Sequence, residues 1–559
     1  MPKLDAFEEF NRWRHQYPAP CQAACPVHTD VRSYVTLTAR GRFNEAFTAA
    51  RDPNPFAAVC GRACSAPCED VCTRREFDKP VRIRKLKRFL TDRYEARGVE
   101  KTPTPPTGVA VGVIGAGPAG MTAAHDLAMK GHAVTIYEAA NEPGGMTLLG
   151  VPRFRLSHDA INRDLASILD LGIELRTGIR VGHDVSLEQL RSDHQAVFIG
   201  AGAMRWNDLD VPGVDLPGVI QSLPLLEESN LGGRPKCGKE VAVIGGGYTA
   251  VDACRTAIRL GAEKVTMLYR RTRAETEVHD EEMEDTLREG VNIEYLVSPL
   301  KMVEGLDGRV AGVRCIRNRL GEPDASGRAR PVPIEGTEFV FTADMVILAL
   351  GQQPDAESLD PKVGADLRTT DPDTSMTPED GVFAGGDFVT GASTIIEAVA
   401  GGHAAAESIH RYLHDRYAPD GGWPEVERFE IQSIENMMSS ATLADAEGEP
   451  DLGLDVEAEL TMAEREAMAD GLRCLYCGLP PSVVFDLCTA CQACAIICPE
   501  ECIHRVALDD DGSVRPVEDV RDFAVYEIDQ DACIYCGRCF KACPTGAIVV
   551  GVEEAGSPT

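Results

Sequence analysis

The chain has 559 residues, 44% of them hydrophobic, which allows roughly three to five domains with sizeable cores. Its net charge of −32 argues against a nucleic-acid partner, because phosphate backbones are bound by clustered Lys and Arg. The acidic surface serves solubility or docks a basic patch of a partner. No segment approaches the ~18 uninterrupted apolar residues of a membrane helix, and the first residues lack a signal-peptide pattern, so we expect a cytoplasmic protein with no membrane partner.

Cysteines are unusually frequent, with 20 in the chain. In a reducing cytosol they indicate metal ligands rather than disulfides. Three of them, Cys237, Cys254 and Cys315, are scattered and fit small core positions. The others form two groups at the two ends of the chain. The first lies in a polar, helix-like region and comprises Cys21, Cys25, Cys60, Cys64, Cys68 and Cys72.

A proline-rich stretch at 101–107 predicts a linker, and a βαβ pattern follows it to about residue 415. The pattern opens at 109–120, where an apolar strand runs into a G-x-G-x-x-G turn. We expect a helix over 121–130 and a second strand over 133–137, followed by an acid at the spacing that suits ribose hydroxyls. The motif predicts a dinucleotide whose pyrophosphate lies on a helix N-terminus. The residues predicted to hold it are Gly115, Gly117, Gly120 and Glu138.

A later segment, 381–398, completes this nucleotide site. It reads Gly-Val-Phe-Ala-Gly-Gly-Asp and then Ala-Ser-Thr-Ile-Ile-Glu-Ala, and it resembles the closing FAD motif of flavoproteins with two dinucleotide domains. The resemblance implies that Asp387 binds the ribityl chain and that the helix after Thr394 points its positive end at the flavin. With the Pro-Gly-Gly-Met run at 143–146, the predicted FAD residues gain Gly145, Gly386, Asp387 and Thr394.

A second glycine turn, at 240–250, also follows an apolar strand and precedes a helix expected over 250–260. The next strand, 264–269, ends in Arg-Arg-Thr-Arg, where an NAD domain usually has a carboxylate. Arginines suit a 2′-phosphate, which favours NADP(H) over NAD(H). Alternatively, they pair with the acidic stretch 275–285. The residues predicted to bind NADP(H) are Gly245, Gly247, Ala250, Arg270 and Arg271.

The C-terminal region contains the remaining cysteines. An acidic stretch at 416–458 predicts a surface-wrapping linker, and Thr461-Met-Ala-Glu464 fits a capping box that opens a helix before Cys474. Two C-x2-C-x2-C-x3-C-P runs then follow, which is the pattern of a two-cluster bacterial ferredoxin, a one-electron relay in which the fourth cysteine of each run serves the other cluster. Cys502 is a spare thiol. The predicted ligand sets are Cys488, Cys491, Cys494 and Cys543 for one cluster, and Cys533, Cys536, Cys539 and Cys498 for the other.

These motifs predict an α/β multidomain protein. It has an N-terminal helical iron–sulfur domain, two Rossmann-like domains with the NAD(P) domain inserted in the FAD domain, and a C-terminal α+β ferredoxin domain. The expected boundaries are 1–104 for the helical domain, 105–225 and 341–415 for the FAD domain, 226–340 for the NAD(P) domain, 416–478 for a linker and 479–559 for the ferredoxin domain.

The motifs together resemble one family. Cys-Gly-Arg-Ala-Cys-Ser-Ala-Pro-Cys-Glu-Asp-Val-Cys at 60–72, the first glycine turn, Gly-Val-Pro-Arg-Phe-Arg-Leu at 150–156 and Gly-Gly-Gly-Tyr-Thr-Ala at 245–250 look like the small (beta) subunit of NADPH-dependent glutamate synthase. Relatives include the large subunit of NADH-dependent ferredoxin:NADP transhydrogenase and the N-terminal half of dihydropyrimidine dehydrogenase. The resemblance covers roughly residues 15–415 and implies FAD, NAD(P)H and one or two N-terminal [4Fe–4S] clusters in addition to the two C-terminal ones.

The chain departs from this family at the N-terminal clusters. The family has a further C-x2-C before the position of Cys21, and it often uses a Gln or Glu ligand where this chain has Arg-Lys-Leu-Lys-Arg-Phe at 84–89. Six cysteines cannot supply two four-thiolate clusters. One hypothesis is that Cys474 and Cys477 fold back to join Cys21 and Cys72, which leaves the second cluster to Cys25, Cys60, Cys64 and Cys68. The alternative is that Cys474 and Cys477 are structural and a single N-terminal cluster forms.

The predicted function is an enzyme that passes electrons between NAD(P)H and low-potential one-electron carriers, through FAD and the clusters. No acid–base dyad or nucleophile is required, because the cofactors carry the chemistry. We expect an electron-transfer subunit of a larger complex, with a ferredoxin or a redox enzyme subunit as partner in a hetero-oligomer. The alternatives are a stand-alone NAD(P)H:ferredoxin oxidoreductase and a non-catalytic iron–sulfur scaffold.

Overall fold

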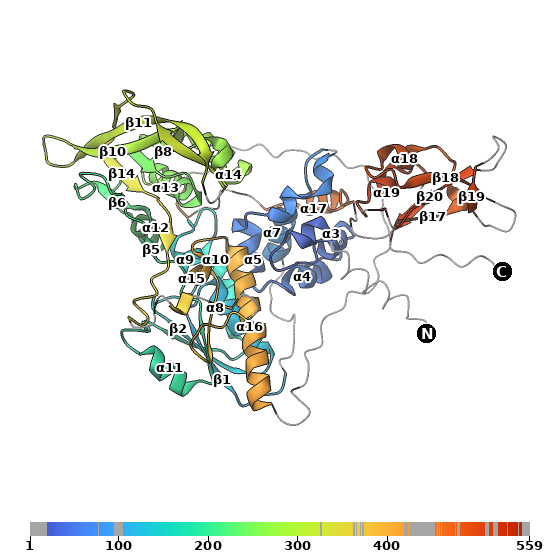
Figure 1. Cartoon of the computed structure of the whole chain (residues 1–559), viewed down its shortest axis with the longest axis horizontal. Helices are drawn as coiled ribbons and strands as arrows, with labels where there is room; N and C mark the ends of the chain where they lie inside the picture. Colours follow the sequence, from blue (N-terminus) through green and yellow to red (C-terminus); the bar gives the residue numbers. More distant parts are fainter. Residues whose placement is uncertain are drawn as a thin grey trace.

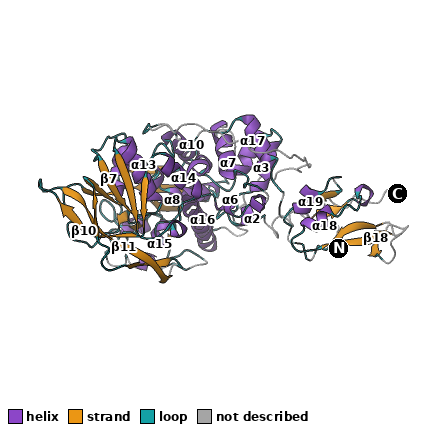
Figure 2. Cartoon of the chain, turned by 90° about the horizontal axis from the view of Figure 1, so that it is seen from above, coloured by secondary structure: helices purple, strands orange, loops and turns teal. Residues whose placement is uncertain are grey.

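The computed structural model describes residues 19–76, 78–93, 104–324, 327–361, 364, 366–368, 370–371, 374–418, 423, 453–455, 457, 459, 461–475, 477, 481–508, 514–517, 524–530, 532–533, 535–545 and 547–550. Two views at right angles show two sheet-containing domains at one end, a helical domain in the middle and a small domain at the other end (Figures 1 and 2). The helical domain therefore lies between the nucleotide motifs and the C-terminal cysteines.

The first βαβ domain consists of β1 (Ala110–Ile114), α8 (Pro118–Met129), β2 (Ala133–Glu138), α9 (Met146–Leu149), α10 (His158–Leu169), β3 (Glu174–Thr177), α11 (Leu187–Asp193), β4 (Ala196–Ile199), η3 (Asp366–Arg368), β16 (Val382–Ala384), α15 (Asp387–Thr390) and α16 (Ile395–Tyr417). Its parallel sheet has the strand order β16-β4-β1-β2-β3. The late strand β16 pairs with β4 from Val382 opposite Val197, so a segment distant in sequence completes the sheet. Helix α8 begins three residues before its predicted start, because a proline is well suited to the first helical position.

The second βαβ domain is inserted between those two segments. Its elements are β6 (Val219–Gln221), α12 (Ser222–Asn230), β7 (Glu240–Ile244), α13 (Tyr248–Arg259), β8 (Lys264–Tyr269), η2 (Arg273–Glu275), α14 (Asp280–Arg288), β9 (Asn292–Tyr295), β10 (Val297–Glu304), β11 (Val310–Pro323), β12 (Ala329–Pro333), β13 (Phe339–Thr342) and β14 (Met345–Leu348). The parallel order is β6-β14-β7-β8-β9, and β10 to β13 form an antiparallel sheet. Because β6 and β14 are strands of this sheet, the inserted domain extends beyond both expected boundaries, 226 and 340. A short antiparallel pair, β5 (Arg205–Trp206) with β15 (Gln352–Gln353), joins the two crossovers.

The helical domain is discontinuous. It contains α2 (Pro20–Ala23), α3 (Val31–Ala39), α4 (Phe43–Arg51), α5 (Ala57–Ala63), α6 (Pro67–Asp70), η1 (Thr73–Glu76) and α7 (Ile83–Arg93), with α17 (Glu464–Gly471) packed on α3 and α7. Met462 and Ala467 are buried in the same core as Tyr34 and Leu86. The expected linker over 416–478 therefore ends in a helix of the N-terminal domain. The predicted cap at Thr461 is wrong, because α17 begins at Glu464 and the Glu466 carboxylate accepts the Ala463 amide.

The C-terminal domain is a small α+β unit. It comprises β17 (Pro481–Val483), η4 (Phe485–Leu487), α18 (Ala493–Ile497), β18 (Ile503–Leu508), β19 (Val514–Pro516), β20 (Ala524–Ile528), α19 (Arg538–Ala542) and β21 (Ile548–Val550). β18 lies between β19 and β20, and β17 pairs with β21, so each cysteine run is followed by a strand. The predicted four-part α/β architecture is confirmed. Among the described helices, none is both long and apolar enough to cross a membrane.

Candidate nucleotide and iron–sulfur sites

The first glycine turn joins β1 to α8 at the carboxyl edge of the sheet. Gly115 has φ +97°, and a Cβ on Gly120 would lie 1.9 Å from the Gly115 carbonyl oxygen. Both glycines are therefore required by the fold itself, which brings the helix N-terminus close to the strand end.

Gly117 is different, because the protein leaves space beside it. Its φ is −77°, which any residue adopts, and a Cβ there would meet only the Cα of Gly145, at 3.9 Å. Neither the backbone conformation nor the packing requires glycine at this position. A side chain here would, however, keep a pyrophosphate from approaching the N-terminus of α8. The turn therefore fits FAD.

The other predicted FAD residues gather at the same edge. The buried Glu138 carboxylate, at the end of β2, accepts the Ala116 and Ala140 amides at 2.7 Å each and so holds the glycine turn. Asp387 follows β16 and accepts the Ser393 hydroxyl at 2.7 Å, while burial raises the pKa of its carboxyl. Thr394 is the N-cap of α16 and donates to Glu397 at 2.8 Å.

The second glycine turn repeats this design at β7 and α13. A Cβ on Gly245 would lie 2.3 Å from the Ala349 carbonyl oxygen, so this glycine is required by packing. A Cβ on Gly247, the N-cap of α13, would have no neighbour within 4 Å. Ala250 is fully buried on the first turn of the helix. Space is again left at Gly247, where a pyrophosphate would approach.

The two predicted 2′-phosphate residues lie in different surroundings. Arg271 is buried and pairs with Asp324 at 2.7 Å, and its Nε donates to the Ala329 carbonyl at 2.8 Å, so it braces the β11–β12 hairpin. Arg270 is exposed, and among the described residues no carboxylate pairs with its guanidinium. Partial burial and the neighbouring positive charge of Arg271 lower the pKa of Arg270. Arg270 is therefore the arginine that can receive an anion here.

In the helical domain, one cavity is lined by Cys21, Cys72, Cys474 and Cys477. Cys21 follows Pro20 on α2, Cys72 precedes η1, and the other two follow α17. Burial raises the pKa of Cys21 well above its usual value, and Cys474, Cys477 and Cys72 raise it further, as expected for thiols facing one another. The fold-back hypothesis named this same quartet.

The other four N-terminal cysteines form a quartet of their own. The neighbouring thiol of Cys60 lowers the pKa of Cys64 to about 6, against the opposing effect of burial. Burial raises the pKa of Cys68, and the nearby Cys64 and Cys25 raise it further. Buried Lys87, on α7, is a positive charge that acts on three of these thiols. Cys25 and Cys60 belong to the same hydrophobic core as the first βαβ domain, so this quartet lies on the side of the first glycine turn.

The C-terminal domain contains two further cysteine-lined cavities. One is lined by Cys488, Cys491, Cys494 and Cys543, and the other by Cys498, Cys533, Cys536 and Cys539, with Cys502 beside Cys498 at 3.4 Å between the sulfurs. In each cavity, the fourth cysteine comes from the other run. Four converging thiols are the donor set that a [4Fe–4S] cluster requires.

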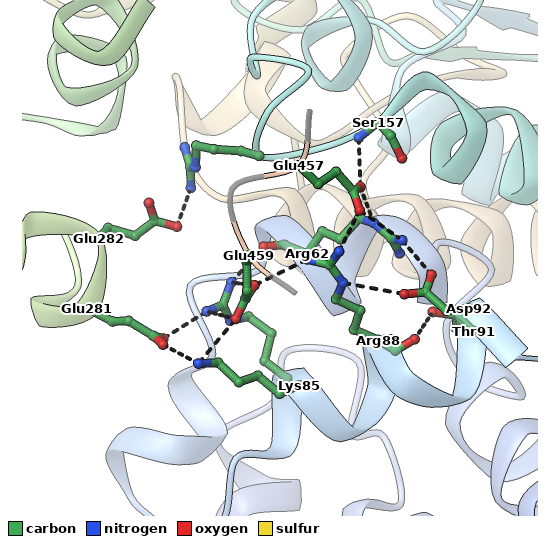
Figure 3. Close-up of polar contacts among 12 residues, drawn as sticks. Arg62, Lys85, Arg88, Thr91, Asp92, Ser157, Glu281, Glu282, Glu457 and Glu459 are labelled. Atoms are coloured by element: carbon green, nitrogen blue, oxygen red, sulfur yellow. Dashed lines mark hydrogen bonds and ion pairs between the residues drawn. The ribbon is translucent and has the colours of Figure 1, made fainter. Parts of the chain in front are cut away.

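Two acidic residues that were not predicted as part of any site, Glu457 and Glu459, lie at the domain junction (Figure 3). Glu457 pairs with the buried guanidinium of Arg62 at 2.6 Å and with Arg88, and it accepts the Ser157 amide at 3.2 Å. Glu459 and Glu281, from opposite sides, both pair with Lys85, at 3.3 and 2.5 Å. Glu457 and Glu459, which alternate in the sequence and pair with the basic α7, are the signal that could have revealed this contact.

The Gly-Val-Pro-Arg-Phe-Arg-Leu motif is also a domain contact. Arg155 donates to Asp252 at 2.8 Å and to Glu282 at 2.9 Å, both in the inserted domain. Phe154 is buried beneath the Arg259 guanidinium, 3.7 Å from the ring centroid. The motif therefore fixes the two nucleotide-binding domains against each other.

Comparison with known families agrees with this arrangement. Residues 109–403 match the pyridine nucleotide-disulphide oxidoreductase family, residues 1–99 match dihydropyrimidine dehydrogenase domain II (4Fe-4S cluster), and residues 487–547 match the 4Fe-4S dicluster domain. These matches support FAD, NADP(H) and [4Fe–4S] clusters at both ends of the chain as its cofactors.

Curated relatives give the same result. The chain is 41% identical over 71% of its length to the NADP(+)-dependent formate dehydrogenase subunit beta of Moorella thermoacetica, and it spans 60% of that protein's length. It is 34% identical over 84% of its length to the NADPH-Fe(3+) oxidoreductase subunit beta of Geobacter sulfurreducens, covering 76% of it. It is 37% identical over 73% of its length to the glutamate synthase [NADPH] small chain of Azospirillum brasilense, covering 89% of it. The chain thus belongs to the pyridine nucleotide-disulphide oxidoreductase family, in the group of the glutamate synthase small chain, and carries iron–sulfur domains at both ends.

Proposed function

We propose that this chain is the NADP(H)-linked electron-transfer subunit of a larger redox complex. It passes electrons between NADP(H) and a low-potential one-electron carrier, either a ferredoxin or a redox centre of a partner subunit. The observation that carries the proposal is the order of the domains, with the two nucleotide-binding domains at one end, the helical domain in the middle and the ferredoxin-like domain at the other end (Figure 2). The helical domain and the ferredoxin-like domain each contain two cysteine quartets.

Each group of residues has a role in holding its cofactor. Gly117 leaves room for the FAD pyrophosphate and Gly145 packs against Gly117, while Glu138 faces the ribose and Asp387 the ribityl chain. Gly247 admits the NADP(H) pyrophosphate, and Arg270 receives the 2′-phosphate. When bound, FAD exchanges hydride with a nicotinamide and single electrons with [4Fe–4S] clusters. The chain itself supplies position and charge rather than a nucleophile or an acid–base pair.

We assign the N-terminal clusters to the two quartets found in the helical domain. The first is Cys25, Cys60, Cys64 and Cys68, on the flavin side, and the second is Cys21, Cys72, Cys474 and Cys477, on the ferredoxin side. The cysteines from the end of α17 replace the C-x2-C pair that the family has near its N-terminus. Each quartet supplies four thiols, so no Gln or Glu ligand is required.

The names of the relatives support a hetero-oligomer, because they denote subunits or small chains of larger enzymes. The test is anaerobic purification from the native host, followed by size-exclusion chromatography and identification of co-eluting chains. We expect a second, catalytic subunit to co-elute and NADPH to bleach the flavin. A free oligomer of this chain alone with full ferredoxin-reducing activity would instead support the stand-alone oxidoreductase. A flavin that NADPH does not bleach would rule out both enzyme functions.

A further inference from the structure

The second quartet of the helical domain touches the ferredoxin-like domain directly. The thiol of Cys477 lies 3.2 Å from the main-chain carbonyl oxygen of Cys536. These two cysteines line different cavities. Cys477 lines the cavity of Cys21 and Cys72, and Cys536 lines the cavity of Cys498 and Cys533. The two candidate cluster sites are therefore separated by one thiol and one peptide group.

The residue after Cys536 explains how the two domains come so close. A Cβ on Gly537 would lie 2.0 Å from the Leu475 carbonyl oxygen, within the Cys474–Cys477 segment. Gly537 is buried at this contact. Any side chain there would push the ferredoxin-like domain away from the segment.

The internal repeat shows that this glycine is not needed by the ferredoxin fold. Gln492 occupies the equivalent position in the first cysteine run, with φ +68° and ψ −4°, while Gly537 has φ +73° and ψ 3°. Both residues are N-caps of the helix that carries the third cysteine of their run. Gln492 is exposed. The same backbone therefore accepts a long side chain in the first run, and the close approach to Leu475 explains the glycine in the second.

The next residue adds an ion pair across the same contact. Arg538 pairs with Glu76, which ends η1 immediately beyond Cys72. The equivalent residue in the first run is Ala493. The hydroxyl oxygen of Thr73, also on η1, lies 3.4 Å from the Cys477 sulfur. The second run alone thus carries a Gly-Arg pair that matches this surface.

We propose that Gly537, Arg538 and Glu76 are positioning residues that dock the second ferredoxin run onto the Cys21/Cys72/Cys474/Cys477 site and make this contact the fixed electron junction between the two iron–sulfur domains. The inference rests on the proposed function, because it assumes that each of the two quartets binds a cluster. It further identifies the Cys533–Cys539 side of the ferredoxin-like domain as the inner side, and the Cys488–Cys494 side, where Cys491 is exposed, as the side that faces a partner.

The test uses the anaerobically purified full-length holoprotein and two kinds of variant. Gly537→Gln copies the first run and should keep flavin and iron at wild-type content. Arg538→Glu breaks the ion pair, and Arg538→Glu with Glu76→Arg restores it in reverse. Gln492→Gly is the matched control. The readouts are the low-temperature EPR spectrum of the reduced protein, in which neighbouring clusters split each other's signals, and freeze-quench EPR after mixing with NADPH.

We expect Gly537→Gln and Arg538→Glu to lose the splitting between the two domains and to lose prompt reduction of the ferredoxin-like clusters. Flavin bleaching by NADPH should be unchanged, and the charge swap should restore both EPR signatures. Unchanged splitting and unchanged reduction in both variants would overturn the inference. Should Gly537→Gln lose iron, the Arg538→Glu variant and its charge-swap rescue decide in the same way. If wild-type flavin were not bleached by NADPH, it is the proposed function that would fail.

Discussion

A Cβ on Gly145 would lie 2.9 Å from the Cα of Gly117, so the two glycine loops of the first nucleotide site are in direct contact. This contact lies at the predicted FAD site. Gly117 has free space on its other side, whereas Gly115 and Gly120 are enclosed by the strand–helix turn. The fold therefore requires Gly115 and Gly120 and leaves space at Gly117.

The first prediction follows from that distinction. Gly117→Ala should preserve the fold and lose most of the bound FAD, because its methyl group meets no backbone atom closer than 3.9 Å but occupies the approach of the pyrophosphate. The measurement is the flavin-to-protein ratio, with circular dichroism to check folding. Gly247→Ala is the matched control, and it should keep FAD while raising KM for NADPH. Full flavin content in Gly117→Ala would contradict the assigned site.

The second prediction concerns coenzyme choice. Arg270→Ala should reduce kcat/KM for NADPH by roughly 10- to 100-fold with little effect on NADH, since a hydrogen bond to a charged group contributes about 1.5–3 kcal/mol. The check is steady-state diaphorase activity with each nucleotide.

Arg271→Ala provides the comparison. It should lower the melting temperature, because it leaves Asp324 without this partner and frees the β11–β12 hairpin. Equal losses with NADPH and NADH in Arg270→Ala would show that Arg270 does not recognise the 2′-phosphate.

The third prediction concerns iron. Cys474→Ser with Cys477→Ser should remove about four irons per chain, because a [4Fe–4S] cluster cannot be held by the remaining Cys21 and Cys72. Iron and acid-labile sulfide are measured on anaerobic protein. Cys254→Ser, buried in α13 far from every cavity described above, is the control and should keep all iron. Unchanged iron in the double variant would end the fold-back assignment.

The fourth prediction is a pH dependence that does not involve the clusters. His132 and His410 share a hydrogen bond of 2.9 Å, and burial, with nearby positive charge, lowers the pKa of each to about 4. Their folded pKa values lie below the usual 6.5, so the unfolded chain binds more protons between pH 6.5 and 4. Their contribution to stability is therefore full above about pH 6.5 and falls as the pH drops.

The pH effect is measured as the change in melting temperature between pH 7.5 and 5.5 under anaerobic conditions. His132→Asn with His410→Gln should show a smaller loss than the wild type. His183→Gln is the control, because this histidine is exposed and pairs with its neighbour Asp184. An acid-induced loss in the double variant as large as that of the wild type would contradict the prediction.

Much of the architecture could be predicted because its signals are local. A strand followed by a glycine turn and a helix predicts a nucleotide-binding βαβ unit. The repeated ferredoxin run predicts which cysteines share a cluster. The Cys474–Cys477 fold-back could be proposed from the number of thiols that clusters need. Long-range pairings could not be predicted. No residue near Arg271 in the sequence indicates that Asp324 is its partner. The ion pair between Glu457 and Arg62 depends on the packing of α17 against the N-terminal helices.

Electron transfer from NADPH through FAD to the clusters is tested most directly by an anaerobic titration of the purified holoprotein with NADPH, followed by absorbance of the flavin and EPR of the clusters. We expect NADPH to bleach the flavin and signals of reduced [4Fe–4S] clusters then to develop in the same protein. Protein that carries no flavin, or clusters that stay oxidised after NADPH is added, would contradict it.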